Sequence, residues 1–308
     1  MLQPNFLKSP FLISLIIATA VFFITCSKMA PSKPPVQIQQ TLPAETELPE
    51  LADVIAQLSA ASDPQGASRN DAGEFRNLLN DVLISAGIPP ELSRKLESAA
   101  AESPAFILDL LACLEGDPYL RMLVDKQHPL PEGYEPDDLV ELKDASYRVG
   151  RQGLMLRRAA AEALEEMAAA AKADGVTLVA SSGYRSWNYQ VEVYGRIVRE
   201  MGQVAADRES ARPGHSQHQT GLVVDFGSID DSFAETPAGR WIETNGSRFG
   251  WSISFPDGYE EVTGYRWESW HYRYVGRDLA AFIAVWFEGI QQYALQFIHE
   301  WEKAGVDF

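Results

Sequence analysis

The sequence predicts an α+β fold with a central antiparallel sheet, flanked by helices and preceded by a small helical region. Long stretches with helical apolar spacing come first along the chain. Short β-rich runs, separated by Gly, Asp and Pro, cluster after about residue 220. Helices followed by clustered strands favour this class over a regular alternation of strands and helices.

Residues 1–26 form an apolar segment that we expect to lie outside the fold. Lys8 precedes the uninterrupted apolar run Phe11–Thr25, which has the length of a signal-peptide core and is short for a membrane span. Cys26 follows directly, as in a bacterial lipoprotein that is processed and acylated at this cysteine. An uncleaved anchor and a signal peptide cleaved elsewhere are the alternatives, and all three place the remaining chain in the cell envelope or periplasm.

Two further regions precede the main domain. Residues 27–70 are rich in Pro, Ser, Gln, Ala and acidic residues, which predicts a flexible linker. Residues 71–120 are predicted to be helical, because Phe75, Leu78, Leu79, Val82 and Leu83 fall on one helix face. The sequence does not indicate a function for this helical region.

Residues 121–308 are predicted to form the main domain. The expected elements are a helix over 154–174, a strand over 176–180, a helix over 188–201, strands over 222–226, 251–255 and 267–275, and one amphipathic helix over roughly the last 30 residues. Glycines, prolines and acidic residues separate these elements.

Charge and cysteine content exclude several classes of protein. The net charge of −17 argues against nucleic acid or an anionic membrane surface as a partner, because both require a basic patch. Cys113 is the only cysteine besides Cys26, so a two-cysteine zinc site is excluded, as is an internal disulfide if Cys26 is acylated. Cys113 lies in an apolar run and is expected to be buried.

Two short motifs contain the ligands of a zinc site. His218 and Asp225 occur in Ser216-Gln-His-Gln-Thr-Gly-Leu-Val-Val-Asp225, and His271 ends Glu268-Ser-Trp-His271. A catalytic zinc ion commonly takes three such ligands and leaves a fourth position open. Residues seven apart on a regular strand face opposite sides, so we expect a bend at Gly221, with His218 on a loop and Asp225 in the strand.

A glutamate and an arginine complete a hydrolytic site. Zinc lowers the pKa of its water to about 7, and Glu268 is the candidate for moving the proton. Because residues three apart on a strand also point oppositely, the strand must be broken between Glu268 and His271. Arg185, in Ser182-Gly-Tyr-Arg-Ser186, can bind a carboxylate or a developing oxyanion.

The stretch from Leu123 to Tyr293 resembles the VanY-type D-alanyl-D-alanine carboxypeptidases, relatives of the VanX dipeptidases and of the hedgehog zinc domain. Both metal motifs match the family pattern, as does the Ser-Gly-Tyr-Arg-Ser motif with Gln190 after it. The family's His-Pro-Leu-Pro sequence recurs at His128–Pro131. One departure is Val223, where the family usually has alanine.

The resemblance implies roles for individual residues. His218, Asp225 and His271 would bind zinc, Glu268 would act as base and acid, and Arg185 would hold the substrate carbonyl or carboxylate. Ser216 and Gln190 would contact or orient the substrate. Next to these motifs, Tyr184 is a candidate substrate contact, Trp270 is a candidate pocket wall, and His215 is either a contact or a loop residue.

The resulting functional hypothesis is an exported zinc D,D-carboxypeptidase that removes the terminal D-alanine of peptidoglycan stem peptides. The alternatives are an L,D-carboxypeptidase, a D,D-dipeptidase or endopeptidase on the same peptides, and a non-catalytic zinc-stabilised domain that binds the cell wall. No nucleic acid partner is expected, and membrane contact is expected only through an N-terminal lipid or signal anchor. The sequence leaves the oligomeric state and the bond that is cleaved open.

Overall fold

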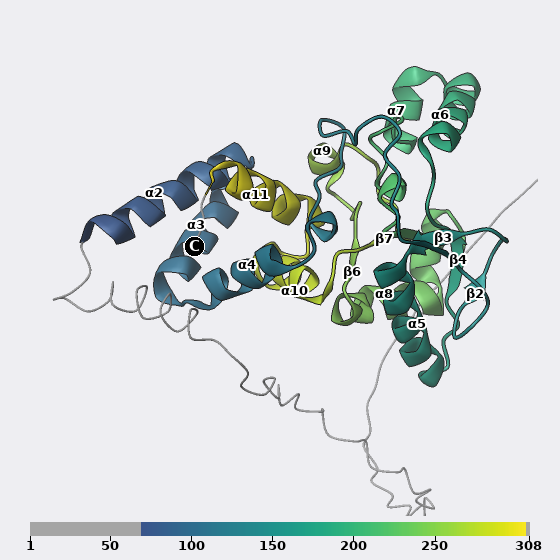
Figure 1. Cartoon of the computed structure of the whole chain (residues 1–308), viewed down its shortest axis with the longest axis horizontal. Coiled ribbons are helices and arrows are strands. Elements are labelled where there is room, and N and C mark those ends of the chain that lie inside the picture. Colours follow the sequence, from purple (N-terminus) through teal and green to yellow (C-terminus); the bar gives the residue numbers. More distant parts are fainter. Residues whose placement is uncertain (1–68, 306–308) are drawn as a thin grey trace, which may run out of the picture. The chain divides into compact units, whose positions relative to one another are not determined.

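The computed structural model describes residues 69–305 of the chain (Figure 1). The predicted signal segment, Cys26 and nearly all of the predicted linker lie outside the described residues. Between residues 69 and 305, no helix combines the length and the apolar character that a membrane crossing requires.

A helical layer joins the two ends of the described chain. Its members are α2 (Arg69–Ser85), α3 (Pro90–Glu102), α4 (Ala105–Glu115), α10 (Arg277–Trp286) and α11 (Gln291–Lys303). Buried side chains from all five helices form one apolar core, and Figure 1 shows α10 and α11, in yellow, beside the blue N-terminal helices. The region that the sequence predicts to be helical therefore packs against the C-terminal helices.

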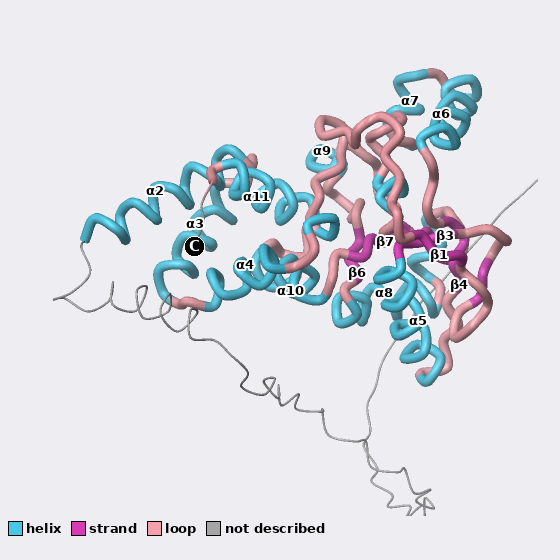
Figure 2. The backbone as a smooth tube through the Cα atoms, in the orientation of Figure 1, coloured by secondary structure: helices cyan, strands magenta, loops and turns pink. Residues whose placement is uncertain are grey.

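The central sheet has five short strands in the order β2-β4-β5-β7-β6, and Figure 2 shows strands in magenta near the centre of the described chain. They are β2 (Arg148–Val149), β4 (Val179–Ser182), β5 (Val223–Phe226), β6 (Trp251–Ile253) and β7 (His271–Tyr274). All neighbours pair antiparallel except β2 and β4, which are parallel. The predicted fold class is confirmed, with this one parallel pair at an edge.

One face of the sheet is covered by a second apolar core. Val224, Phe226 and Tyr272 point into it, together with side chains of α5 (Arg158–Ala173) and Ile242 of α8 (Pro237–Asn245). Strands alternate the direction of their side chains, so the neighbouring residues Asp225 and His271 face the opposite side of the sheet. The remaining elements are β1 (Leu139–Glu141), β3 (Met155–Arg157), α6 (Trp187–Met201), α7 (Gln203–Glu209), α9 (Glu260–Thr263) and short 3-10 turns.

The prediction of a single C-terminal helix is wrong, because the segment forms two helices, α10 and α11, with a turn between them. Glu288 and Gly289 both adopt positive φ, of 55° and 80°, which no α-helix accommodates. The break turns the chain so that both helices bury apolar residues in the same core. The periodic apolar spacing continues across the break and conceals it.

Three other boundaries differ from the prediction. The helix expected from Leu154 begins at Arg158, because residues 155–157 pair with β1 as strand β3. The strand expected over 176–180 is β4 at Val179–Ser182. The strand expected over 267–275 starts only at His271. In addition, α8 lies between the expected strands 222–226 and 251–255, where the sequence predicted no helix. Pairing with distant strands sets where these strands begin and end, and local sequence propensity does not predict that pairing.

Candidate active site

Strand register brings three site residues into one row. Asp225 on β5 pairs with Ser182 on β4 and with His271 on β7. Because residues directly opposite each other on neighbouring strands point to the same face, the three side chains lie side by side. All three are at least nine-tenths buried, with exposed fractions of 3%, 1% and 4% for Ser182, Asp225 and His271.

His218 joins this row from a 3-10 helix, Gln217–Thr220, that precedes β5. Gly221 ends the helix in the left-handed conformation at φ 73°, and the chain turns there into the strand. The predicted bend at Gly221 and the placement of Asp225 in the strand are thus confirmed. The His218 Nδ1 atom donates to the carbonyl oxygen of Gly183 over 2.8 Å, which leaves Nε2 free to bind a metal.

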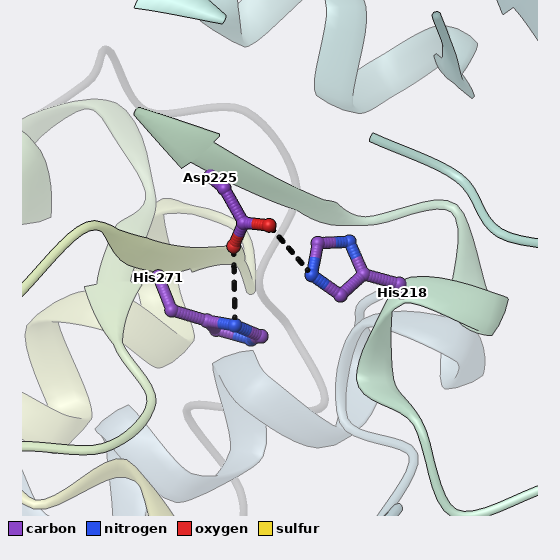
Figure 3. Close-up of side chains that lie close together, drawn as sticks. All are labelled: His218, Asp225 and His271. Atoms are coloured by element: carbon purple, nitrogen blue, oxygen red, sulfur yellow. Dashed lines mark ion pairs between the residues drawn. The ribbon is translucent and has the colours of Figure 1, made fainter. Parts of the chain in front are cut away.

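His218, Asp225 and His271 converge on one point, as Figure 3 shows. Their ligand atoms all lie within 4.8 Å of one another. The distance from His218 Nε2 to Asp225 Oδ2 is 3.2 Å, and that from His271 Nδ1 to Asp225 Oδ1 is 3.3 Å. The buried Asp225 Oδ1 has no hydrogen bond, a costly arrangement that a bound cation would relieve. Two imidazoles and a carboxylate fit zinc.

The pKa values of this group reflect burial and close charges. Burial and the Arg185 guanidinium lower the pKa of His218 to about 4, so its ring is neutral at pH 7. Burial opposes ionisation of Asp225, but His218, His271 and Arg185 outweigh it and hold the pKa of this carboxyl well below its usual range. Burial also opposes the charge of His271, yet Asp225 and Glu268 raise its pKa to about 9. The site therefore favours an ionised carboxylate as a ligand.

Glu268 lies beside the ligand group. Its Oε2 is 3.1 Å from His271 Nδ1, and its side chain is 12% exposed. The chain turns immediately before β7, where the His271 amide donates to the Glu268 carbonyl oxygen over 3.3 Å. This turn is the predicted break in the strand, and it places the carboxylate within reach of both the metal group and the cleft.

Arg185 follows β4 in the chain and contacts two residues of the row, Ser182 and Asp225. Its Nη2 donates to Asp225 Oδ2 over 2.8 Å and to Ser182 Oγ over 3.0 Å. The side chain is 19% exposed and faces the same cleft. The guanidinium is thus held in position beside the metal group while donors remain for a substrate.

The row opens into a cleft of about 520 Å³. Its walls include the predicted substrate residues Gln190, Ser216 and Trp270, together with His215. Gln190 is anchored by a bond from its Nε2 to the Ala211 carbonyl oxygen over 2.7 Å. Its buried Oε1 has no protein partner and is free for a ligand. Tyr184 does not line the cleft, so the structure does not bring this candidate to the substrate.

Several cleft residues escape the motif analysis. Arg151 precedes β3, Tyr189 and Arg196 lie on α6, and Tyr265 and Arg266 precede β7. A helical-face pattern over 189–201 would have revealed the α6 members, because Tyr189, Val193, Arg196 and Ile197 share one face. Arg151 carries no local signal, since only the tertiary fold brings it to the cleft.

Sequence comparisons relate the chain to known carboxypeptidases. The family described as "VanY: D-alanyl-D-alanine carboxypeptidase" matches residues 153–277. The putative carboxypeptidase YodJ of Bacillus subtilis is 38% identical over 184 residues, which are 57% of this chain and 67% of YodJ. A D-alanyl-D-alanine carboxypeptidase of Enterococcus faecalis is 33% identical over 215 residues, 66% of this chain and 77% of that protein. The chain belongs to the VanY family. It is therefore a carboxypeptidase, as its motifs predict.

A solved carboxypeptidase structure supports the same conclusion. The structure described as "Structure of the LdcB LD-carboxypeptidase reveals the molecular basis of peptidoglycan recognition" aligns with a TM-score of 0.51 and 36% identity. The alignment covers 59% of this chain and 85% of LdcB. The chain is thus similar both to a D-alanyl-D-alanine carboxypeptidase and to an LD-carboxypeptidase.

Proposed function

We propose that this member of the VanY family is an exported, zinc-dependent D,D-carboxypeptidase that removes the terminal D-alanine from peptidoglycan stem peptides. The observation that carries the proposal is the convergence of His218, Asp225 and His271 at the floor of a cleft, with Glu268 beside them. The D-alanyl-D-alanine carboxypeptidase of E. faecalis, at 33% identity, supports the choice of bond.

The ligand set assigns the metal chemistry. A zinc ion held by His218, Asp225 and His271 would lower the pKa of water and polarise the scissile carbonyl. The hydrogen bond from His218 to Gly183 fixes the ring so that Nε2 faces the other two ligands. Asp225 would balance part of the charge of the ion.

Glu268 and Arg185 supply the remaining steps. The Glu268 carboxylate takes a proton from the attacking water and delivers it to the nitrogen of the departing D-alanine. Arg185 donates to the substrate carboxylate or to the oxyanion that develops on the scissile carbonyl. Gln190 Oε1 is a free acceptor on the cleft wall that can orient the peptide.

Metal content and product mass test the proposal together. We expect about one zinc ion per purified chain and release of a single D-alanine from a pentapeptide stem that ends in D-alanyl-D-alanine. A chain that loads zinc and releases no amino acid or dipeptide from any stem peptide would contradict the proposal. Absence of zinc binding would contradict the ligand assignment.

An L,D-carboxypeptidase is the second candidate, and the 36% identity to LdcB favours it. The two activities share the metal group and differ in the residue before the scissile bond. Release of D-alanine from a tetrapeptide stem, with the pentapeptide left intact, would support the L,D activity. Release of the intact dipeptide from a stem would indicate an endopeptidase, and hydrolysis of free D-alanyl-D-alanine to two D-alanines would indicate a D,D-dipeptidase.

The proposed location rests on the N-terminal sequence. Lys8, the apolar run Phe11–Thr25 and Cys26 form a lipoprotein-like export signal. We expect mature protein from membranes to begin with an acylated Cys26, as measured by mass spectrometry. The Cys26→Ser variant should lose this mass and leave the membrane fraction.

A further inference from the structure

The cleft extends well beyond the residues that surround the metal group. Along one wall, α6 presents Tyr189, Gln190, Val193, Arg196 and Ile197. An α-helix rises about 1.5 Å per residue, so Arg196 lies about 9 Å along the helix axis from Gln190. An extended peptide advances about 3.3 Å per residue, and the wall therefore matches about three residues.

Only the upstream part of a substrate can fill this extension. A carboxypeptidase releases the last residue, and nothing follows that residue in the chain. The volume of about 520 Å³ lies in the range of sites for drug-sized ligands, which are larger than a dipeptide. At the rim, Tyr189, Met201 and Ile229 leave 39%, 47% and 52% of their surfaces exposed, as contacts for an aliphatic chain would require.

Four arginines line the cleft, but their charges are not equivalent. Arg185 pairs with Asp225, and Arg266 pairs with Glu209 and Asp231. Within the part of the chain that the structure describes, Arg151 and Arg196 form neither an ion pair nor a hydrogen bond.

The flanking residues do not neutralise this charge. Glu192 and Glu200 lie four residues on either side of Arg196 on α6, and neither reaches its guanidinium within ion-pair distance. The Arg151 guanidinium lies over the Tyr189 ring, with its carbon 5.9 Å from the ring centroid. Both arginines line the cleft, and in a chain of net charge −17 these two positive charges without an ion-pair partner among the described residues favour an anionic group there.

We infer that Arg151 and Arg196 form a subsite for a carboxylate on the substrate, two or three residues before the residue that is released. The inference rests on the proposed function and specifies its substrate class as acidic, non-amidated stem peptides. Two sources have this chemistry: the free α-carboxyl of a γ-linked glutamate and the second carboxyl of a diamino diacid. Guanidinium groups bind carboxylates through paired N–H donors, whereas the amide has no charge to pair.

Matched pentapeptide stems test the subsite. One pair differs only in a carboxylate or carboxamide on glutamate, and the second pair has diaminopimelate or lysine at the third position. We expect kcat/KM to be about fivefold to tenfold higher for the carboxylate member of at least one pair, and that pair identifies the source. The preference should fall to near onefold in the double variant Arg151→Gln/Arg196→Gln.

The control variant is Arg199→Gln. It removes the same charge from the same helix, but Arg199 does not line the cleft, so the carboxylate preference should remain. Equal cleavage of both members of each pair by the unaltered protein would overturn the subsite. A preference that survives in the double variant would overturn it as well.

Peptide binding separates this inference from the proposed function. Calorimetry with the Glu268→Gln variant measures Kd without turnover, and we expect several-fold weaker binding of the carboxamide peptides. Charge-dependent binding without hydrolysis by the unaltered protein would sustain the subsite and contradict the proposed function. Hydrolysis without any charge dependence would support the proposed function and contradict the subsite.

Discussion

Gln292 donates a hydrogen bond from Nε2 to Asp125 Oδ2 over 2.7 Å, although 167 residues separate the two in sequence. Gln292 is the second residue of α11, and the Asp125 carbonyl oxygen accepts from His215 Nδ1 over 2.7 Å. The helical layer is thereby connected to a wall of the cleft. The hydrogen bond to the Asp125 backbone holds the His215 ring at the cleft wall. From the sequence, His215 was expected to be either a substrate contact or a loop residue.

Loss of this connection should destabilise the protein. Gln292 is 4% exposed, and Gln292→Ala would leave the Asp125 carboxylate without one of its partners. We expect the free energy of unfolding to fall by about 1–3 kcal/mol in denaturant titrations. Gln203→Ala, at an exposed position on α7, should change it by less than about 0.5 kcal/mol. Equal losses in the two variants would refute a role for the bond.

Glu268→Gln should separate metal binding from catalysis. The glutamine keeps the shape of the side chain but cannot take a proton, so we expect kcat to fall by about 10²- to 10⁴-fold. Zinc content, measured by elemental analysis, should stay near one ion per chain. His218→Ala should instead lose the ion. Full activity of the Glu268→Gln variant would exclude Glu268 as the proton carrier.

Zinc binding should release a proton near neutral pH. Without metal, Asp225 and Glu268 raise the pKa of His271 to about 9, so its ring is protonated at pH 7. The proton must leave before Nδ1 can bind zinc, and apparent affinity should therefore rise with pH until about pH 9. Calorimetry in buffers of different ionisation enthalpy counts the protons. An affinity that is constant between pH 6.5 and 8.5 would argue against this view.

Cys113 should be unreactive in the folded protein. Burial and the nearby Asp278 raise the pKa of its thiol to about 12, and the residue is 5% exposed. In a Cys26→Ser background, we expect a thiol reagent at pH 8 to label Cys113 only after denaturant is added. Rapid labelling of the native protein would show that the helical layer opens easily.

The metal group was readable from the sequence because it depends on local features. Short spacing fixes His218 relative to Asp225, Gly221 permits the necessary turn, and Glu268 stands three residues before His271. The three ligands therefore carry their signal in two short motifs. Their positions in the structure agree with what those motifs predict.

Features that depend on distant contacts were not readable. The break at Glu288 and Gly289 is hidden, because the apolar spacing continues on both sides and a glutamate rarely adopts positive φ. Residues 155–157 look helical until β1 is available as a partner. Arg151 becomes a cleft residue only when β2 and β4 have paired, and no motif surrounds it.

Asp225 and His271 can bind one metal ion together only if β5 and β7 pair in the observed register. Metal content therefore indicates whether these strands are correctly paired. A slip of one residue between β5 and β7 would turn His271 toward the apolar core and place a tyrosine or a tryptophan opposite Asp225. A misassembled molecule would then have only two of the three ligands in reach. Retained zinc can consequently serve as a quality check during purification, because it distinguishes correctly paired sheets from compact but misaligned ones.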